Sequence, residues 1–359
     1  MGRALDVAAT ARRHAPPWPW VGCVLVRGGE IVGAGATGAY RAGPHAEVAA
    51  LAAAGDAARG ATAYVTLEPC DHHGNTPPCT EALLAAGVAR VVVAIGDPDP
   101  LVSGKGFARL RAAGVDVIDG VCAPEATEQL APYLRHRRTG RPFVVAKIAT
   151  SLDGGVAAAD GSSRWITSAV ARADSHGLRA DSQAILVGSG TAIVDQPALT
   201  VRDATPMPSR QPTRVLLDAR GRVPATGPLF DAELAPTLVV TTEQAPAAAR
   251  DAWLAAGAKV EVVDPGVAGG VDLDTVLALL GREGVLQVLV EGGGRLLGSV
   301  LEGGHAQRLV VYVAPLVLGA RGKPGYVMPG ADTIDAARRF NLLTVRQLGP
   351  DVRLDYEVA

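Results

Sequence analysis

Short apolar runs rich in β-branched residues alternate with alanine- and leucine-rich segments along almost the whole chain. In the first part, residues 61–67, 90–97 and 115–119 form such runs, and segments with helical character lie between them. This βαβ rhythm predicts a layered α/β domain with a mostly parallel sheet. Two further β-branched runs flank Gly28 and Gly29, and that arrangement predicts a β-hairpin.

The chain has 359 residues, well above the ~150 residues that serve as a soft prior for one domain. A polar, basic stretch at 134–142 follows a helix-like segment, and the alternation of strands and helices then restarts. We therefore expect two domains, at 1–140 and 141–359, with the boundary in this stretch. The proline-rich segment 202–214 is predicted to be a surface loop.

Hydrophobic residues make up 48% of the chain and charged residues 19%, which is the balance of an ordinary globular protein. The formal net charge of -2 shows none of the basic excess typical of proteins that bind nucleic acids. No segment approaches the ~18 consecutive apolar residues of a membrane span, and the first residues lack a signal-peptide pattern. We expect a cytoplasmic protein with no nucleic-acid partner and no membrane attachment.

Four cysteines in a chain of this length are too few for a secreted fold held by disulfides. Cys23 and Cys122 lie in or just after strand-like runs, so they are expected to be small buried hydrophobic residues. Cys70 and Cys79 instead flank a polar loop that contains two histidines. These two are better candidates for metal binding or catalysis.

His45, Cys70 and Cys79 have the chemistry of zinc ligands. Two thiolates and one neutral imidazole make three ligands, the number typical of a catalytic zinc site whose fourth position stays open to water. A structural site would need a fourth protein ligand, and His72 or His73 could supply it.

Glu47 stands two residues after His45, at the start of an alanine-rich helix-like segment. Side chains two residues apart do not share a helix face, so Glu47 is a poor co-ligand for the same metal. A carboxylate beside a zinc-activated water can instead carry protons, first as a base and then as an acid to a departing amine. The order H-x-E, then P-C and a second cysteine, is typical of zinc-dependent nucleobase deaminases, although the two cysteines are spaced C-x8-C here and not C-x-x-C. A catalytic site therefore has a role for Glu47, whereas a closed structural site has none.

Four stretches of the first domain stand out together: VGCVLVRGGEIVGAG, PHAEVAAL, LEPCDHHGNTPPC and GDPDPLVSGKG. In this combination the domain resembles, almost from end to end, the deaminase domain of the bifunctional deaminase/reductase family of riboflavin biosynthesis. The resemblance implies a three-layer fold like that of cytidine deaminases. It also implies His45, Cys70 and Cys79 as the ligands of Zn²⁺ and Glu47 as the proton donor.

Two positions depart from this family pattern. Trp18 stands between two prolines where the family usually has asparagine, and Asp99 stands where a second asparagine is common. Both positions are expected to lie close to the pyrimidine pocket. Trp18 and Trp20 could either stack on the substrate or pack the N-terminal segment against the core.

In the second domain, VLQVLVEGGGRLLGSV runs from an apolar strand through three glycines into a helix-like segment. Glycines at such a junction let backbone N–H groups approach a phosphate at the positive end of the helix. A turn of this kind without a ligand is about as common. Glu291 at its start could equally be a solvated turn residue.

Two more stretches, KIATSLDGGVAAADGSSRWIT and LRADSQAILVGSGTAIVDQPALTVR, resemble together with EGGG the reductase domain of the same family, whose fold is similar to dihydrofolate reductase. This resemblance covers most of residues 143–359. The NADPH contacts that it implies are Ala149, Trp165, Thr191, Asp195, Gly293, Gly294, Arg295, Leu296, Leu297, Gly298 and Ser299. The substrate contacts that it implies are Lys147, Ser163, Arg179, Leu199, Arg202 and Glu291.

Arg179 and Arg202 have the chemistry to grip a ribose 5-phosphate through charge-assisted hydrogen bonds. Taken alone, each arginine is better read as a solvated charge and Trp165 as a core residue. The resemblance instead implies that the two arginines contact the substrate and that Trp165 contacts NADPH.

Together the two resemblances imply an enzyme with two activities. The first domain would hydrolyse the 2-amino group of 2,5-diamino-6-(5-phosphoribosylamino)pyrimidin-4-one, and the second would reduce the ribosyl chain with NADPH to give 5-amino-6-(5-phosphoribitylamino)uracil. Two alternatives stay open, a paralogue acting on a related pyrimidine and a nucleotide-binding regulatory protein with a degenerate site. The expected partners are the small-molecule substrate and further copies of the chain, as a dimer or tetramer.

Overall fold

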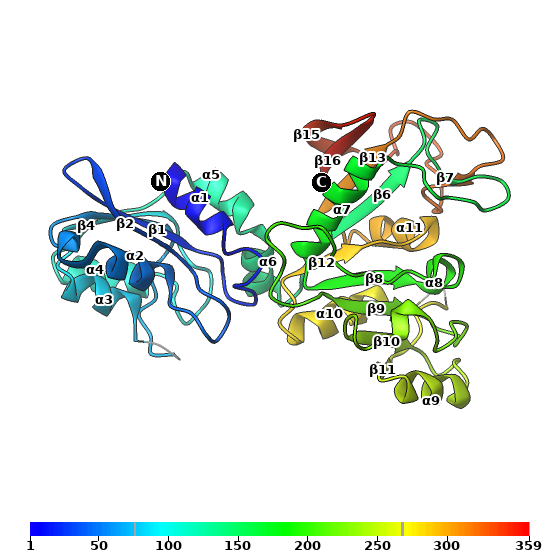
Figure 1. Cartoon of the computed structure of the whole chain (residues 1–359), viewed down its shortest axis with the longest axis horizontal. Coiled ribbons are helices and arrows are strands. Elements are labelled where there is room, and N and C mark those ends of the chain that lie inside the picture. The colour runs from blue at the N-terminus through cyan, green and yellow to red at the C-terminus, as the bar shows by residue number, and fades with distance from the viewer. Residues whose placement is uncertain (75–76, 267–268, 359) are drawn as a thin grey trace. The chain divides into compact units, whose positions relative to one another are not determined.

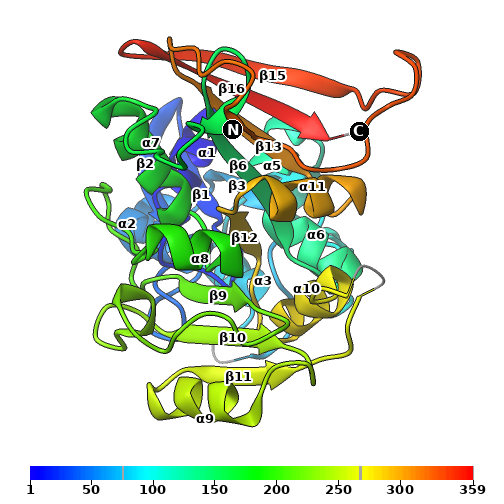
Figure 2. The same ribbon diagram turned by 90° about the vertical axis from the view of Figure 1, so that its right-hand side faces the viewer.

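The computed structural model describes residues 1–74, 77–266 and 269–358 and separates the chain into two units, Met1–Arg141 and Pro142–Ala359 (Figures 1 and 2). The predicted loop between Cys70 and Cys79 falls partly outside the described residues. Each unit has its own main sheet with helices packed on it, so each is described by itself.

The sheet of the first unit has the strand order β2-β1-β3-β4-β5. Its strands are β1 (Gly22–Arg27), β2 (Glu30–Ala36), β3 (Thr62–Leu67), β4 (Arg90–Ile95) and β5 (Asp116–Ile118). The predicted hairpin is confirmed, because β1 pairs antiparallel with β2 through a turn at Gly28 and Gly29. β1 also pairs antiparallel with β3, whereas β4 pairs parallel with both β3 and β5. Since β2 and β3 are both antiparallel to β1, β2 runs in the same direction as β3, β4 and β5. The expectation of a mostly parallel sheet is therefore confirmed for this unit, because β1 alone runs against the other four strands described for this sheet.

Helices cover both faces of this sheet. They are α1 (Gly2–Ala9), α2 (Ala46–Ala54), the 3₁₀ turn η1 (Gly55–Ala58), α3 (Cys79–Ala85), α4 (Lys105–Ala112), α5 (Ala123–Gln129) and α6 (Ala131–Thr139). Gly22 of β1 meets α1, where a Cβ would lie 2.0 Å from the Ala4 carbonyl oxygen. The next residue, Cys23, pairs with Gly35, and a Cβ on Gly35 would lie 2.4 Å from the Ala50 backbone nitrogen of α2. Because neighbouring strand residues point to opposite faces, α1 and α2 lie on opposite sides.

The two cysteines outside the predicted metal group differ in burial. Cys23 is fully buried in β1, as expected. Cys122 is only partly buried, so the expectation of a buried hydrophobic residue is wrong there. It occupies the N-cap of α5 with φ of 59°, a position at the edge of a helix rather than inside the core.

The main sheet of the second unit has the strand order β11-β10-β9-β8-β12-β6-β13-β16-β15. Its strands are β6 (Phe143–Thr150), β8 (Ala184–Gly188), β9 (Thr213–Leu217), β10 (Thr237–Thr241), β11 (Lys259–Val262), β12 (Gln287–Val290), β13 (Arg308–Val313), β15 (Phe340–Leu348) and β16 (Asp351–Val358). The strands from β11 to β13 are parallel, whereas β16 and β15 add an antiparallel edge. A small antiparallel pair joins β7 (Gly155–Ala157) to β14 (Lys323–Pro324).

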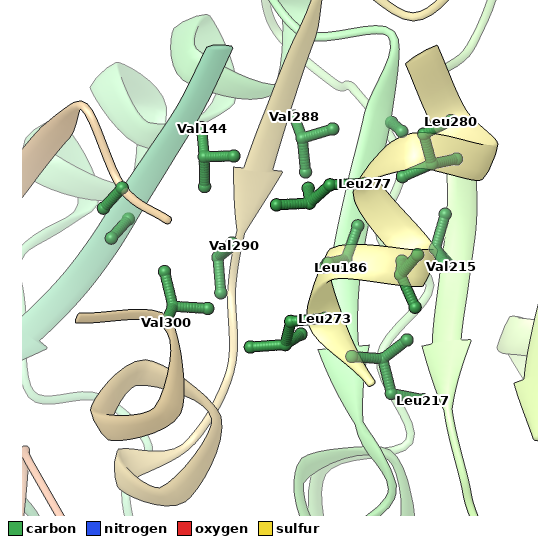
Figure 3. Packing of buried hydrophobic residues seen from close by; sticks show 14 of the residues in the cluster. Val144, Leu186, Val215, Leu217, Leu273, Leu277, Leu280, Val288, Val290 and Val300 are labelled. Carbon is green, nitrogen blue, oxygen red and sulfur yellow. The ribbon is translucent and has the colours of Figure 1, made fainter. Parts of the chain in front are cut away.

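Alternating strand residues of this sheet feed two separate cores. Val144 and Ala146 of β6 belong to one cluster, and Val145 belongs to the other. Helices α10 (Leu273–Arg282) and α11 (Gly294–Glu302) pack on the first face, and α7 (Ala169–Ala180), α8 (Ser189–Asp195) and α9 (Ala247–Ala255) contribute to the second. Figure 3 shows leucines of α10 packed on the sheet: Leu273, Leu277 and Leu280 on the helix, and Leu186, Val215, Leu217 and Val288 on the strands.

Among the connections between strands of the second unit, one was predicted from the sequence and two elements were not. Residues 202–212 form neither helix nor strand before β9 begins, so the predicted proline-rich loop is confirmed over this range. The alternation pattern alone did not predict α8, which follows β8 directly, or the 3₁₀ turn η2 (Pro228–Phe230). No helix in the described part of the chain is both long and apolar enough to cross a bilayer.

Candidate active sites

Three potential metal ligands meet at the amino ends of two helices in the first unit. His45 is the N-cap residue of α2, Cys79 is the first residue of α3, and Cys70 lies in the loop after β3. Their ligand atoms all lie within 4.8 Å of one another. His45 Nδ1 is 3.2 Å from Cys79 Sγ and 3.6 Å from Cys70 Sγ. Two sulfur atoms and one imidazole nitrogen form a donor set that suits Zn²⁺, so these residues fit the metal.

The two histidines of the intervening loop do not join this group. Within the described residues, the ligand cluster consists of His45, Cys70 and Cys79. His73 Nε2 lies 3.5 Å from Glu81 Oε1, and its side chain is exposed. The geometry therefore favours the three-ligand site over the closed four-ligand site.

Cys70 and Cys79 are joined by a hydrogen bond. Cys70 Sγ accepts a hydrogen bond from the Cys79 backbone N–H at 3.4 Å. Hydrogen bonding from Cys79 lowers the pKa of Cys70, which favours the thiolate at this position. Hydrogen bonding with Cys70 likewise raises the pKa of His45.

Glu47 sits beside this cluster but outside the ligand group. It lies in the first turn of α2 and is only 4% exposed. Burial raises the pKa of its carboxyl group to about 7, and the charge of Cys70 adds to the rise. The fold thus brings a buried carboxyl group to the side of three ligands that the sequence separates by up to 34 positions.

The structure separates the two tryptophans that the sequence left undecided. Trp20 is 2% exposed, and its Nε1–H donates to the Gln129 carbonyl oxygen at 3.1 Å, so it packs in the core. Trp18 contacts His45 edge-to-face with ring centroids 5.8 Å apart, and it contacts Tyr40 in the same way at 5.1 Å. Trp18 is therefore an immediate neighbour of a potential zinc ligand.

Asp99, the second departure from the family pattern, has a compensating cation. Its Oδ2 lies 3.2 Å from Arg137 Nε, and its Oδ1 accepts the Leu101 N–H at 3.0 Å. Arg137 also lies over the Tyr133 ring at 5.0 Å, and the Tyr133 hydroxyl donates to Asp97. The carboxylate at position 99 thus belongs to a local network that includes α6.

Glu68 is a site-building residue that sequence reasoning missed. Its buried carboxylate accepts backbone N–H groups from four residues at 3.0 to 3.4 Å: Asp97, Gly104, Gly106 and Phe107. Because Glu68 lies two residues before Cys70, these bonds hold the ligand loop against the start of α4. A charged residue between an apolar strand and Pro69 was the available signal.

In the second unit, three charged residues converge near the carboxyl ends of parallel strands. Arg179 of α7 grips Glu291 with two nitrogen atoms, Nε to Oε1 and Nη2 to Oε2, the latter at 2.9 Å. Lys147 of β6 lies 3.9 Å from Glu291 Oε2. Burial alone would raise the pKa of Glu291, but attraction to Arg179 and Lys147 and the hydrogen bonds from Arg179 outweigh it and hold the pKa at about 2. Glu291 is therefore an ionised partner of two cations whose side chains are only 18% and 15% exposed, and it is not a solvated turn residue.

The remaining predicted substrate contacts lie in two loops. Leu199 is buried in the core face that carries α7, with φ of 49°, whereas Arg202 is exposed. Arg179 Nη1 donates to the Thr200 carbonyl oxygen at 3.0 Å, which ties this loop to the charged group. Ser163 is half-buried in the loop that precedes α7.

The predicted nucleotide turn begins at the amino end of α11. Gly293 is the N-cap residue, and its N–H donates to Thr191 Oγ1 of α8 at 2.9 Å. Farther along, Leu297 is fully buried, and a Cβ on Gly298 would lie 2.2 Å from the Val327 carbonyl oxygen. A Cβ on Gly294 would likewise lie 2.8 Å from a carbonyl oxygen of the segment around 324. Gly294 and Gly298 therefore allow the segment around residues 324–327 to pack closely against α11, whether or not a ligand binds at the amino end of this helix.

The other predicted cofactor contacts lie on several segments of the second unit. Trp165 is 67% exposed, and its ring lies 4.3 Å from the Arg172 guanidinium carbon, so it is not a core residue. The Asp195 carbonyl oxygen at the end of α8 accepts Arg164 Nη2 at 2.7 Å. The others are half-buried or exposed: Ala149, Arg295, Leu296 and Ser299. Helix α8 is thus tied to the residue before Trp165 through Arg164 and to the glycine turn through Thr191.

Comparison with known proteins identifies relatives of both units. The model of the cytidine and deoxycytidylate deaminase zinc-binding region matches residues 1–95, and that of the RibD C-terminal domain matches residues 142–354. Riboflavin biosynthesis protein RibD from Escherichia coli (strain K12) is 42% identical over 368 residues, which cover 99% of this chain and 97% of the relative. RibD from Mycobacterium tuberculosis is 40% identical over 359 residues, which cover 99% and 95%.

Solved structures agree with this relationship. Acinetobacter baumannii RibD, form 1, is 38% identical with a TM-score of 0.90, and the match covers 100% of this chain and 97% of that one. A Thermotoga maritima deaminase/reductase is 32% identical with a TM-score of 0.86 and the same coverage. These likenesses confirm the deaminase-like and reductase-like fold classes, and they exclude a purely regulatory protein. The chain therefore belongs to the RibD family, and it is a bifunctional enzyme of riboflavin biosynthesis with a zinc-dependent deaminase and an NADPH-dependent reductase activity.

Proposed function

We propose that His45, Cys70 and Cys79 hold the zinc of the deaminase and that Glu47 carries its protons. The observation that supports this most is the meeting of three ligand atoms within 4.8 Å beside a buried carboxyl group that is outside the ligand set. Zinc, when bound there, supplies a Lewis acid that makes water a nucleophile near neutral pH. We infer 2,5-diamino-6-(5-phosphoribosylamino)pyrimidin-4-one as the substrate, because the Thermotoga maritima relative is described as a deaminase of this compound class.

In this proposal Glu47 acts twice at the same carboxylate. It takes a proton from the water that adds to the ring carbon, and it returns the proton to the departing amino nitrogen. The carbon–nitrogen bond then breaks and ammonia leaves. The second proton of the water passes from the hydroxyl group to a ring nitrogen, so the ring keeps the oxygen as a carbonyl group. Its position in the first turn of α2, next to His45, fixes the carboxyl group on the same rigid element as a ligand.

For the reductase we propose that Lys147, Ser163, Arg179, Leu199, Arg202 and Glu291 contact the substrate. NADPH, when bound, supplies a hydride to the sugar carbon. The sugar oxygen that is released from that carbon must receive a proton. Lys147 is the residue best suited to provide it, because burial lowers the pKa of its ammonium group and Glu291 keeps it near the charged group.

We also propose an NADPH site around the exposed Trp165, the end of α8 and the first turn of α11. The side chains and backbone groups on the open side of this region are Ala149, Thr191, Asp195, Gly293, Gly294, Arg295, Leu296 and Ser299. Leu297 and Gly298 take part only as packing residues in this proposal, because they face the core and the segment around Val327.

We infer that the protein acts as a homo-oligomer. Strand β15 is the outer strand of the large sheet, and Leu342, Leu343 and Val345 on it are exposed. An apolar outer strand of this kind is a surface that a second copy can cover.

Glu47→Gln tests the deaminase proposal. General acid–base catalysis is typically worth roughly 10²–10⁴ in rate, so ammonia release should fall by that order while zinc stays bound. Supplying the already deaminated uracil should bypass the lesion, and NADPH oxidation should run near the wild-type rate. Unchanged ammonia release would make Glu47 a structural residue, and loss of zinc would make it a ligand.

A further inference from the structure

The loop 199–202 of the second unit is held at three consecutive residues by side chains from other segments. Arg179 donates to the Thr200 carbonyl oxygen at 3.0 Å. Gln211 accepts the Val201 N–H at 2.7 Å and donates to the Val201 carbonyl oxygen at 3.1 Å. His176 Nδ1 accepts the Arg202 N–H at 3.1 Å. Arg179 and His176 lie one turn apart on α7, so that helix controls both ends of the held stretch.

The backbone of this loop has a shape that few residues adopt without such support. Leu199 and Asp203, at its two sides, have φ of 49° and 57°. Non-glycine residues in this region are uncommon, and they persist where the surroundings over-determine the conformation. Here the conformation is supported by the hydrogen bonds of the loop with Arg179, Gln211 and His176.

Arg202 needs this support more than its neighbours do. Its side chain is exposed, and within the described residues its guanidinium group makes no hydrogen bond or ion pair. The direction in which this cation points is therefore set by its backbone. The backbone bond nearest to the side chain is the one from the Arg202 N–H to His176.

His176 can accept this bond only when Nδ1 carries no proton. The charged groups that face it are Arg179 on the same helix, Arg202 and Asp203 on the loop, and Glu291 after β12. Burial lowers the pKa of His176, and the two arginines lower it further against the opposite effect of the two carboxylates. The imidazole is thus neutral under ordinary conditions, with Nδ1 available as an acceptor.

We propose that His176 is a positioning residue of the reductase, which holds the backbone of Arg202 so that its guanidinium group is presented to the phosphate of the substrate. This inference rests on the proposed substrate role of Arg202. His176 touches neither substrate nor cofactor in this scheme. It acts through the loop by supplying one hydrogen-bond acceptor.

A pair of substitutions tests the role of the acceptor. His176→Leu removes it, whereas His176→Asn places an amide oxygen at nearly the position of Nδ1 and does not titrate. With the deaminated substrate and saturating NADPH, His176→Leu should raise KM about three- to tenfold, the effect of one lost hydrogen bond, and leave kcat nearly unchanged. His176→Asn should restore a KM close to that of the wild type. His305→Leu is a matched control, because His305 lies beside Asp274 of α10, a helix that packs on the other face of the sheet from α7.

The pH dependence of KM provides a second test, because a general loss of stability would not change it in the way that protonation of His176 does. Protonation of Nδ1 turns the acceptor into a donor, so the wild-type KM should rise relative to that of His176→Asn below pH 6.5, the ordinary pKa of histidine. The substrate phosphate also titrates near pH ~6, but it does so with every variant, so the ratio of the two KM values isolates His176.

Arg202→Met distinguishes failure of the inference from failure of the proposed site. If Arg202→Met leaves KM unchanged, Arg202 does not bind the substrate and the proposed contact set is wrong. If Arg202→Met raises KM but His176→Leu does not, only the positioning role is overturned. A lower kcat with unchanged KM in His176→Leu, or no rescue by His176→Asn, would also overturn it. Non-additive effects in the double variant are expected, because both substitutions remove the same contact.

Discussion

At the scale of single residues, the contact between Trp18 and His45 is the most distinctive feature of the deaminase unit. Metal-binding histidines usually donate their second ring N–H to a carbonyl or carboxylate oxygen, which fixes the ring. His45 turns Nδ1 to the two sulfur atoms, and its Nε2 has no hydrogen-bond partner among the described residues. The Trp18 ring lies against the imidazole instead. An aromatic side chain therefore takes the place of the usual hydrogen bond.

Trp18→Ala should weaken zinc binding. Loss of a group that orients a metal ligand typically costs about 10- to 100-fold in metal affinity, and we expect the lower end because two thiolates remain. Trp18→Phe should recover most of the affinity, since it keeps an aromatic face. Competition with a chromogenic chelator measures the zinc affinity, and Trp165→Ala, in the other unit, is the control. Equal affinities for wild type and Trp18→Ala would show that Trp18 serves only the pyrimidine pocket or the packing.

Glu291 stabilises the reductase unit in a pH-dependent way. Its folded-state pKa of about 2 lies below the ordinary value of 4.5. A carboxylate with a lowered folded-state pKa contributes stability that is complete above its unfolded pKa and is lost as the pH falls toward the folded value. Glu291→Gln should lower the free energy of unfolding by about 3 kcal/mol at pH 7, the lower end of the range for a buried pair, because it leaves two largely buried cations without their partner.

The difference between Glu291→Gln and wild type should therefore shrink as the pH falls from 4.5 to 2. Hydrogen exchange of backbone amides in β6 and β12 at increasing urea concentrations measures this difference in the free energy of unfolding of the second unit. Glu283→Gln, at an exposed position after α10, is the control and should change little at any pH. A difference that does not vary with pH in this window would contradict the argument.

At the scale of elements, the deaminase site depends on how closely α2 approaches β2. The helix is almost entirely alanine on its inner side, and the strand places Gly33 and Gly35 beneath it. A Cβ on either glycine would lie 2.4 Å from a backbone atom of Ala50. Small residues on both elements thus bring α2 close to the sheet, and α2 carries both His45 and Glu47.

Gly35→Val should displace α2 and so disturb both stability and zinc binding. Overpacking of a close contact typically costs about 1–3 kcal/mol, and backbone atoms cannot rotate away as a side chain can. Gly2→Val is the matched control, because a Cβ at Gly2 meets nothing within 4 Å. Urea unfolding and zinc affinity, measured together, report the effect. A variant as stable as wild type with full zinc affinity would show that α2 can shift without moving its ligands.

At the scale of the whole molecule, each unit has its own sheet and its own group of chemically active residues. The group of three potential metal ligands lies within Met1–Arg141, and the charged group of Lys147, Arg179 and Glu291 lies within Pro142–Ala359. The hydrophobic clusters on the two faces of the larger sheet are formed by residues of the second unit alone. The reductase core therefore does not depend on the metal for its packing.

Removal of zinc by a chelator should abolish ammonia release and leave NADPH oxidation with the deaminated substrate close to its original rate. Parallel assays of the two reactions before and after dialysis measure this, and return of ammonia release on addition of Zn²⁺ is the control. Loss of both activities on chelation would mean that the reductase needs the metal or the folded deaminase unit.

The sequence alone determined the features that depend on local pattern. The alternation of runs predicted two α/β folds, and the glycine pair predicted the hairpin. The chemistry and spacing of His45, Glu47, Cys70 and Cys79 predicted a metal group with a carboxylate beside it. The strands and the hairpin could be predicted because residue type and short spacing carry them directly. The metal group could be predicted because its residue types and their order are typical of zinc-dependent deaminases.

Only the tertiary structure decided which distant residues meet. It placed Trp18 on His45 and Trp20 in the core, although the two are neighbours in sequence with the same chemistry. It joined Glu68 to the loop that begins α4, and His176 to Arg202, across 26 or more positions. It also made β1 antiparallel to both neighbours. Such contacts depend on the path of the whole chain and on the packing that closes it, because no local periodicity specifies which surfaces face each other once the layers have assembled.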